Sequence, residues 1–500
     1  MDARISLILV TVDCLRADHC SFMGYKRPTT PFLDSLARES SVFPTAVVAG
    51  VPTYYSFPAI MASRFPLALG REVLGLAPEE ANLASALKEN GYATAFFGAG
   101  NPYLSARFGY DFGFDTFRDF LHDLAQSSSP NGSSTPRGAR WTDGVNRILE
   151  KASHRIPGIA TAYDELYFQY CQRQLPAAAS LDVLRRFPAA DVIVDGARAW
   201  LASIEKNPFF LWLHFMDAHS PYYPTEKGLR IFGESSLTPL RARYLNAYWN
   251  RFDIGSERLR RHCDEVIAMY DSGVRWVDAQ LSRLVEILRQ FNRWENSIFA
   301  FTADHGEEFL EHDRRYHAPS LVEELIHVPL ILRVPGSKNE PVSSNPFSLV
   351  HLAPTLLAAA DLPIPPEFQG RSHWKQIQEG TEWSEPAISE CIAGCTNPFN
   401  LDQRREARLL SIREARYKLR LNFDTGASDL FDLQADPGEQ APLSRAAAKP
   451  ERRRLLQAAL DHLRKSGTRP SSEDYLRALL RDVDLNVTSP LAATGSNAVV

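Results

Sequence analysis

The strongest constraint on the fold is an alternation of apolar strands with amphipathic helices. Continuous apolar runs cover residues 5–13, 93–100, 208–217 and 297–306, and each adjoins a stretch with helical periodicity. A strand that is apolar throughout is buried on both faces, as in a parallel sheet covered by helices on each side. The pattern therefore predicts an α/β fold with a large, mostly parallel sheet sandwiched by helices.

The expected domain organisation follows from where this alternation stops. We expect a catalytic α/β domain over residues 1–375, with insertions at about 104–181 and 225–263. The first insertion contains SSSPNGSSTPRG, which is typical of a surface loop. Residues 376–470 indicate a small antiparallel sheet and a closing helix, an α+β subdomain, and 471–500 a tail.

Composition excludes several classes of protein. The formal net charge of −5 over 500 residues gives no support for a nucleic-acid partner. The apolar run at the N-terminus is too short to span a bilayer and lacks a signal-peptide pattern, so we expect no transmembrane segment and a cytoplasmic location. The six cysteines lack the spacing of a disulfide scaffold, so they are read as reduced thiols. The oligomeric state is not set by the sequence.

Charged side chains follow three of the predicted strands. Ligands of such sheets bind at the carboxyl ends of the strands, where Asp13, Asp304 and His305 stand. Clustered like charges are costly unless a cation compensates them. We therefore expect one divalent cation here, with Mg²⁺, Mn²⁺ or Ca²⁺ suited to the oxygen ligands and Zn²⁺ to the imidazole.

Two further imidazoles occupy similar positions. His219 follows a strand in FMDAHSPYYP, and His317 precedes a helix and strand in EHDRRYHAPSLVEELIHVPLIL. Beside a cation they could bind an anionic ester and protonate its leaving group as general acids. Alternatively, they could hold a second cation together with Asp217.

Four segments, in the right order along the chain, resemble the sulfatase family of the alkaline phosphatase superfamily. The first, DCLRADHCSFMGYKRPTTPFLDSLARES, is similar to the family's opening signature. FTADHGEEFLEHDRRYHAPSLVEELIHVPLILRVPG resembles its later metal motif. HLAPTLLAAADLPIPPEFQGRS and YKLRLNF…DLFDLQADPGEQAPL are similar to the end of its large domain and to its C-terminal subdomain.

The resemblance implies metal ligands at Asp13, Asp304 and His305, and a nucleophile within VPTYYSFPAIMASRFP. When Ala62-Ser63 is aligned with the family's usual Thr-Gly, Thr53 takes the nucleophile position beside the cation and becomes a fourth ligand. If a helix begins near Ser56, that hydroxyl is its cap, and the helix terminus in front of it favours an anion.

Three departures from the family pattern modify the functional expectation. The C/S-x-P-x-R motif of formylglycine sulfatases is absent, Cys14 replaces one of two paired aspartates, and His317 stands where a lysine is usual. A Thr nucleophile beside an Asp-His pair resembles the superfamily's phosphotransferases and phosphodiesterases. The leading hypothesis is a metal-dependent hydrolase or transferase of small phosphate esters. The alternatives are a sulfuric ester hydrolase without formylglycine and a non-catalytic binding protein with this fold.

Overall fold

A seven-stranded sheet organises the protein. The structure, a computed structural model, describes residues 4–71, 73–121, 159–175, 177–205, 208–233, 236–337, 342–466 and 470–485. The sheet order is β2-β11-β7-β1-β6-β4-β5. These strands are β1 (Ser6–Val12), β2 (Ser41–Val42), β4 (Ala93–Gly98), β5 (Thr116–Arg118), β6 (Phe209–Phe215), β7 (Ser297–Ala303) and β11 (Leu330–Arg333). The five strands from β7 to β5 are mutually parallel, and β11 pairs antiparallel with both β7 and β2.

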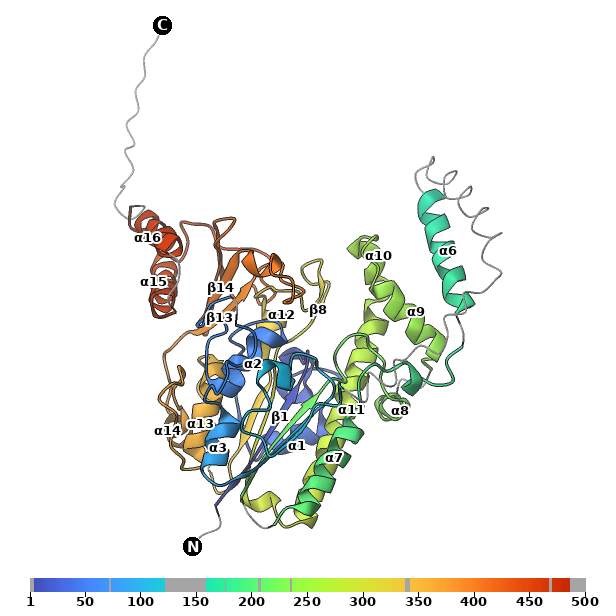
Figure 1. Ribbon diagram of the computed structural model, residues 1–500. Helices are drawn as coiled ribbons and strands as arrows, with labels where there is room; N and C mark the ends of the chain where they lie inside the picture. Colours follow the sequence, from blue (N-terminus) through green and yellow to red (C-terminus); the bar gives the residue numbers. More distant parts are fainter. Residues whose placement is uncertain are drawn as a thin grey trace.

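Helices cover both faces of this sheet (Figure 1). One layer contains α1 (Pro31–Ala37), α7 (Ala190–Ser203) and the long α11 (Cys263–Gln290). The other contains α2 (Thr53–Ala62), α3 (Leu83–Glu89) and α13 (Leu352–Ala359). All seven residues of β1, β6 and β7 are buried, as expected for strands enclosed on both sides. The predicted α/β fold is therefore confirmed.

Smaller elements surround the ends of the central strands. The second insertion forms α8 (Glu226–Phe232), α9 (Pro239–Trp249) and α10 (Ser256–Arg260), and α6 (Ile159–Gln174) precedes α7. Short pairings join β8 (Glu308–Phe309) to β9 (Arg315–Tyr316), and β3 (Ala46–Val47) to β10 (His327–Val328) and β12 (Phe347–Ser348). Helices α12 (Glu323–Ile326) and α14 (Trp374–Glu379) complete this part. The SSSPNGSSTPRG loop expected in the first insertion lies outside the described residues.

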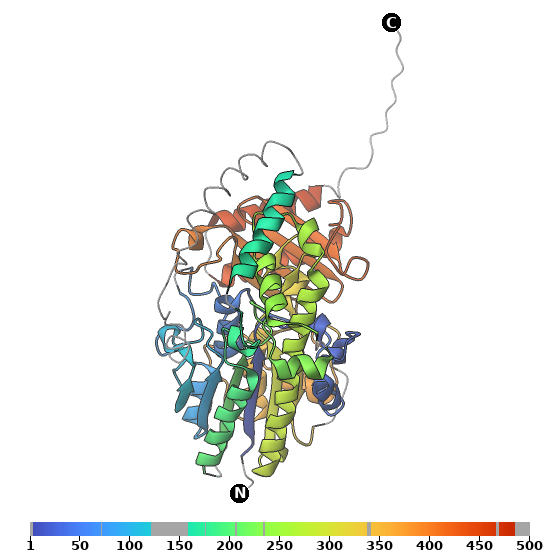
Figure 2. The ribbon, with the colours of Figure 1, turned by 90° about the vertical axis from the view of Figure 1, so that its right-hand side faces the viewer.

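The C-terminal part is a four-stranded antiparallel sheet with two helices, which lies at the top in Figures 1 and 2, at the end of the molecule opposite the N-terminus. Its strands are β13 (Ala387–Ile392), β14 (Arg408–Arg413), β15 (Tyr417–Asn422) and β16 (Ala427–Asp432). Helix α15 (Lys449–Lys465) packs on the sheet and α16 (Pro470–Leu485) packs on α15. The expected tail is thus helical as far as Leu485, because Leu476 and Val483 are buried in the core of this subdomain.

Among the described residues, no helix combines the length and apolarity needed to cross a bilayer.

A buried ion pair joins the two parts of the C-terminal subdomain. Glu390 in β13 contacts Arg408 in β14 and lies 3.2 Å from His462 in α15. Burial alone would raise the pKa of Glu390, but Arg408 and His462 outweigh it and lower that pKa to about 2. The ionised carboxylate therefore stabilises the fold above its unfolded pKa of 4.5.

We predict that Glu390→Gln lowers the free energy of unfolding by about 3 kcal/mol at neutral pH, since Arg408 loses its buried partner. The difference from the unaltered protein should shrink as pH falls from 4.5 toward 2, where the native glutamate is itself protonated. Urea unfolding at several pH values measures this. Glu414→Gln, at the more exposed pair with Arg454, is the control and should cost less than about 1 kcal/mol. A Glu390→Gln effect that does not change with pH would contradict the assignment.

Candidate active site

The register of the parallel strands brings three predicted ligands together. Val12 in β1 pairs with Ala303 in β7, so the next residues, Asp13 and Asp304, leave the sheet at the same level. His305 Nε2 lies 3.7 Å from Asp13 Oδ1 and 3.4 Å from Asp304 Oδ2. All three side chains are fully buried. The structure therefore groups two carboxylates and an imidazole at one point.

The Thr53 hydroxyl joins this group. Thr53 is the first residue of α2, and its Oγ1 lies 3.2 Å from His305 Nε2. This position is at the positive end of the helix dipole, where anions are favoured.

Ser56 does not cap the helix, so that expectation is wrong. Helix α2 begins three residues earlier than the sequence suggests, with Pro52 at the N-cap and no side-chain cap. The Pro52 carbonyl accepts the amides of Tyr55 and Ser56 at 2.7 and 3.2 Å. Ser56 therefore sits inside the first turn, where its hydroxyl donates to the Thr53 carbonyl at 3.2 Å.

The protonation of His305 suits a ligand. Its Nδ1 lies 2.9 Å from the Gly306 carbonyl, which can only accept, so Nδ1 carries the hydrogen and Nε2 presents a lone pair to the carboxylates. Burial, with a contribution from His317, lowers the pKa of His305 to about 3. The imidazole is therefore neutral at physiological pH and free to bind a cation.

The carboxylates themselves show that a cation fits here. Burial and the neighbouring Asp13 raise the pKa of Asp304 well above its usual range, and Asp304 Oδ2 is a buried oxygen without a hydrogen-bond donor among the described residues. Burial also acts to raise the pKa of Asp13, but His219 and the other imidazoles outweigh it and lower that pKa. An oxygen-rich set with one imidazole matches a divalent cation such as Mn²⁺, Mg²⁺ or Zn²⁺.

Two side chains that hold Asp13 were missed from the sequence. Asn101 donates from Nδ2 to Asp13 Oδ2 at 2.7 Å, and His214 Nε2 lies 3.4 Å from the same oxygen. Asn101 follows β4, so the strand-exit rule could have found it. His214 lies within the apolar run of β6 and gives no comparable signal, because only the pairing of β6 with β1 brings it to Asp13.

His219 and His317 adjoin the group. Their ring centroids are 4.9 Å apart, and the ring of His317 lies 4.8 Å from that of His305. Burial lowers the pKa of His219. Burial opposes the charged form of His317 as well, but Glu307 and Asp13 outweigh it and raise the pKa of His317. His317 therefore binds a proton more readily than His219 does.

Asp217, the further carboxylate considered for a second cation, does not join them. Its Oδ1 accepts from Arg185 at 2.8 Å and from the Ala190 amide at 3.4 Å, at the start of α7. The arginine neutralises its charge and fixes its direction. Cys14 takes this place instead, with Sγ 3.3 Å from His317 Nδ1 and 3.1 Å from Asp13 Oδ1.

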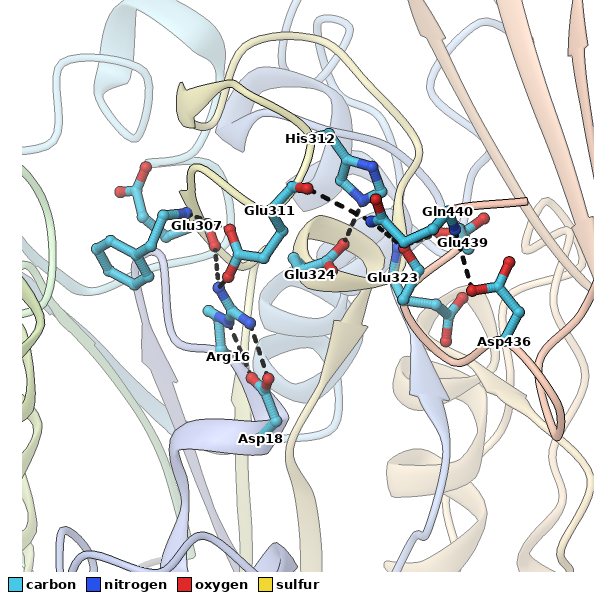
Figure 3. Close-up of polar contacts among 12 residues, drawn as sticks. Arg16, Asp18, Glu307, Glu311, His312, Glu323, Glu324, Asp436, Glu439 and Gln440 are labelled. Carbon is cyan, nitrogen blue, oxygen red and sulfur yellow. Dashed lines mark hydrogen bonds and ion pairs between the residues drawn. The ribbon is translucent and has the colours of Figure 1, made fainter. Parts of the chain in front are cut away.

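The segment after the Asp-His pair is fastened by Arg16, just after β1 (Figure 3). The Arg16 guanidinium donates to the Glu307 carbonyl at 3.0 Å and to both Asp18 oxygens at 2.8 and 2.7 Å, and also contacts Glu311. Gln440 of the C-terminal subdomain donates to the Glu311 carbonyl at 3.4 Å. Both parts of the chain thus hold this segment in place.

A cleft of about 480 Å³ opens onto the group, with Thr53, Asn101, His219 and His317 among its lining residues. Its remaining walls are mostly apolar and aromatic and include Tyr54, Tyr103, Phe187, Met216, Phe252 and Tyr316. Arg315 also lines the cleft, and its guanidinium donates to the carbonyls of Trp249 and Arg251. A small molecule can therefore reach the hydroxyl and both imidazoles.

Solved structures assign this architecture to the alkaline phosphatase-like class of α/β proteins. A phosphonate monoester hydrolase of Agrobacterium radiobacter superposes with a TM-score of 0.64 at 19% identity, covering 93% of this chain and 96% of the other. A protein in complex with its substrate D-glucosamine-2-N,6-O-disulfate superposes with the same TM-score of 0.64 at 16% identity, covering 94% and 99%. At these identities the likeness shows the fold.

The sequence itself identifies the family. The sulfatase family model matches residues 6–362, and the model for the C-terminal part of N-sulphoglucosamine sulphohydrolase matches 308–466. The chain belongs to the sulfatase family, as its motifs predict.

Curated relatives agree with this assignment. Arylsulfatase K of dog is 28% identical over 279 residues, which cover 49% of this chain and 50% of the relative. The chain thus spans about half the length of this relative. An arylsulfatase of Clostridium perfringens is 24% identical over 498 residues, covering 92% and 93%.

We predict that Asp304→Ala abolishes binding of the first cation, because it removes a buried carboxylate that faces His305. Elemental analysis after incubation with Mn²⁺ and dialysis measures the ion content per chain. Asp217→Asn is the matched control, since it alters a buried carboxylate at a neighbouring strand exit that is paired with Arg185. Undiminished Mn²⁺ content in Asp304→Ala would show that the ligand assignment is wrong.

Proposed function

We propose that the protein is a metal-dependent hydrolase or transferase of phosphate esters with Thr53 as nucleophile. The observation that carries this proposal is the position of the Thr53 hydroxyl at the head of α2, 3.2 Å from His305 and beside the two aspartates. A hydroxyl at a helix N-terminus can attack an ester while the helix end binds the ester's anionic group.

Asp13, Asp304, His305 and Thr53 would hold the cation. When bound, the cation neutralises the carboxylates and lowers the pKa of the attacking hydroxyl. Asn101 and His214 orient Asp13, and the Gly306 carbonyl fixes the tautomer of His305. These contacts with the proposed ligand side chains keep the ligand atoms in place.

The chain's own groups account for the remaining steps. Thr53 Oγ1 forms a bond to phosphorus while the bond to the alcohol oxygen breaks, which leaves a phosphothreonine. His219 and His317 line the same cleft as Thr53, where they would stabilise the departing oxygen, either as proton donors or as ligands of a second cation. Water or an acceptor alcohol then releases the phosphoryl group and restores Thr53.

The cleft supports an ester whose alcohol part is apolar or aromatic. The described walls of the cleft are rich in aromatic side chains. The guanidinium of Arg315, which also lines the cleft, donates to the backbone carbonyls of Trp249 and Arg251 and is therefore engaged within the protein. Aromatic walls bind flat apolar groups through burial of their surface. A small anionic ester with such a group is therefore the proposed substrate.

Sulfate ester hydrolysis is the second candidate. It is favoured by the arylsulfatase relatives, and by the solved structure that holds a disulfated glucosamine. Thr53 in place of the Cys or Ser of the C/S-x-P-x-R motif argues for phosphate, because only those residues are converted to formylglycine.

A reducing compartment, and so a cytoplasmic location, is also proposed. All six cysteines are free thiols in the structure, and free thiols are usual where disulfides do not persist.

We predict that Thr53→Ala lowers turnover by roughly 10⁴-fold or more, as expected for loss of a nucleophile, while the fold is kept and Asp13, Asp304 and His305 still hold the cation. Steady-state kinetics, metal analysis and circular dichroism measure the three properties. Ser56→Ala is the matched control, a hydroxyl in the same helical turn that donates only to the Thr53 carbonyl. It should retain most activity. Full activity in Thr53→Ala, or loss of activity only in Ser56→Ala, would contradict the proposal.

We predict that an aryl phosphate or aryl phosphodiester is hydrolysed with a higher kcat/KM than the matching aryl sulfate. Parallel assays with the same aryl group keep the alcohol part constant and compare only the transferred group. A sulfate rate above both phosphate rates would favour the second candidate. Stoichiometric cation binding without turnover of any of the three esters would favour a binding protein.

A further inference from the structure

A second cluster of ligand atoms adjoins the first through Cys14, whose Sγ also lies within 4.8 Å of ligand atoms of Asp13 and His305. Cys14 Sγ, one nitrogen of His219 and one of His317 all lie within 4.8 Å of one another. Zinc bound tetrahedrally at bond lengths of about 2.0–2.3 Å separates its ligand atoms by roughly 3.3–3.8 Å. The Cys14 to His317 distance of 3.3 Å already falls in that range. Small side-chain adjustments would bring the His219 nitrogen into the same range of both.

The hydrogen bonding of His219 leaves one nitrogen free for this role. Its Nδ1 contacts the Ser220 carbonyl, which can only accept, so Nδ1 carries the hydrogen and Nε2 presents a lone pair. A metal-binding imidazole usually donates its other ring N–H to a carbonyl or carboxylate, which fixes its tautomer in this way. His317 directs its Nδ1 toward Cys14 and toward Glu307 Oε2, at 3.3 and 3.5 Å.

The balance of charge also indicates a second cation. Asp13, Asp304 and Glu307 are fully buried, and one divalent ion compensates two of these carboxylates, which leaves Glu307 with the His317 imidazole, 3.5 Å away, as its partner. Glu307 Oε1 is a buried oxygen without a hydrogen-bond donor among the described residues. Arg16 does not relieve this, because it reaches only the Glu307 carbonyl and spends its other N–H groups on acidic side chains.

The backbone aims Cys14 into the cluster. Cys14 has a φ of 61°, a left-handed conformation that residues other than glycine rarely adopt. Such conformations persist where the surroundings impose them and are frequent at functional sites. Here the conformation turns a fully buried thiol toward the imidazole of His317.

We propose that Cys14, His219 and His317 hold a second divalent cation of the thiophilic class, such as Zn²⁺, next to the Asp13–Asp304–His305 site. One sulfur and two nitrogen ligands favour Zn²⁺ over Mg²⁺ or Ca²⁺, which prefer oxygen. Glu307 lies beside the ligands and balances the charge. The site follows from these side chains alone, whichever ester the protein cleaves, and it makes His219 and His317 ligands in place of proton donors.

The test counts ions in the full-length protein. After incubation with Zn²⁺ and dialysis, elemental analysis should give two ions per chain for the unaltered protein and one each for Cys14→Ser and His219→Ala. Cys20→Ser is the matched control, a fully buried cysteine outside the cluster, and should keep two. Loading with Co²⁺ should give a near-ultraviolet thiolate-to-cobalt charge-transfer band that Cys14→Ser lacks.

One ion per chain in the unaltered protein would overturn the second site. So would a Co²⁺ form without the charge-transfer band, which needs no variant and therefore holds even if the variants fail to fold. Loss of both ions in Cys14→Ser with retention of both in His219→Ala would assign the thiol to the first site and overturn the proposal as well. Thr53→Ala should leave the band unchanged, so that failure of the proposed nucleophile is distinguished from failure of this site.

Discussion

The parallel pairing of β1 with β6 and β7 is the constraint on which the rest of the site depends. It fixes the level at which Asp13 and Asp304 leave the sheet, through the pairs of Val12 with Phe215 and with Ala303. A shift of one residue in either pairing would turn the apolar side chains of a strand to the opposite face of the sheet. Because the sheet is buried on both faces, the register is strongly specified, and the positions of the carboxylates are specified with it.

Around this register, the protein fixes its buried charges through contacts from several directions. Asn101 and His214 hold Asp13, the Gly306 carbonyl sets the tautomer of His305, and Arg16 anchors the Glu307 backbone. These contacts still leave Asp304 Oδ2 and Glu307 Oε1 as buried oxygens without a hydrogen-bond donor among the described residues. The buried carboxylates are held in fixed positions but lack enough positive charge around them. A buried site of this kind retains cations.

The helix α2 and the aromatic cleft complete the reaction space that we propose. The helix places a hydroxyl and its positive dipole end against the anionic group of an ester, and the cleft receives the alcohol part. The departures from the family pattern fall together in this small volume, since Thr53, Cys14 and His317 all contact or adjoin the same buried group. Because the three residues lie so close together, their departures from the family pattern support a single change in the reaction that the site performs.

The sequence by itself determined the fold class and the grouping of the three proposed ligands. Apolar strands between amphipathic helices require a covered parallel sheet, and that geometry brings Asp13, Asp304 and His305 to one edge. The start of α2 could not be read from the pattern, because the helix begins at Thr53 with Pro52 at the N-cap and has no side-chain cap that would mark its first residue. His214 was hidden for a related reason, since a polar residue inside an apolar run is informative only when its partner across the sheet is known. Only the tertiary structure decided that Cys14 and not Asp217 stands beside His219 and His317, because Arg185, 32 residues away in the chain, turns Asp217 aside.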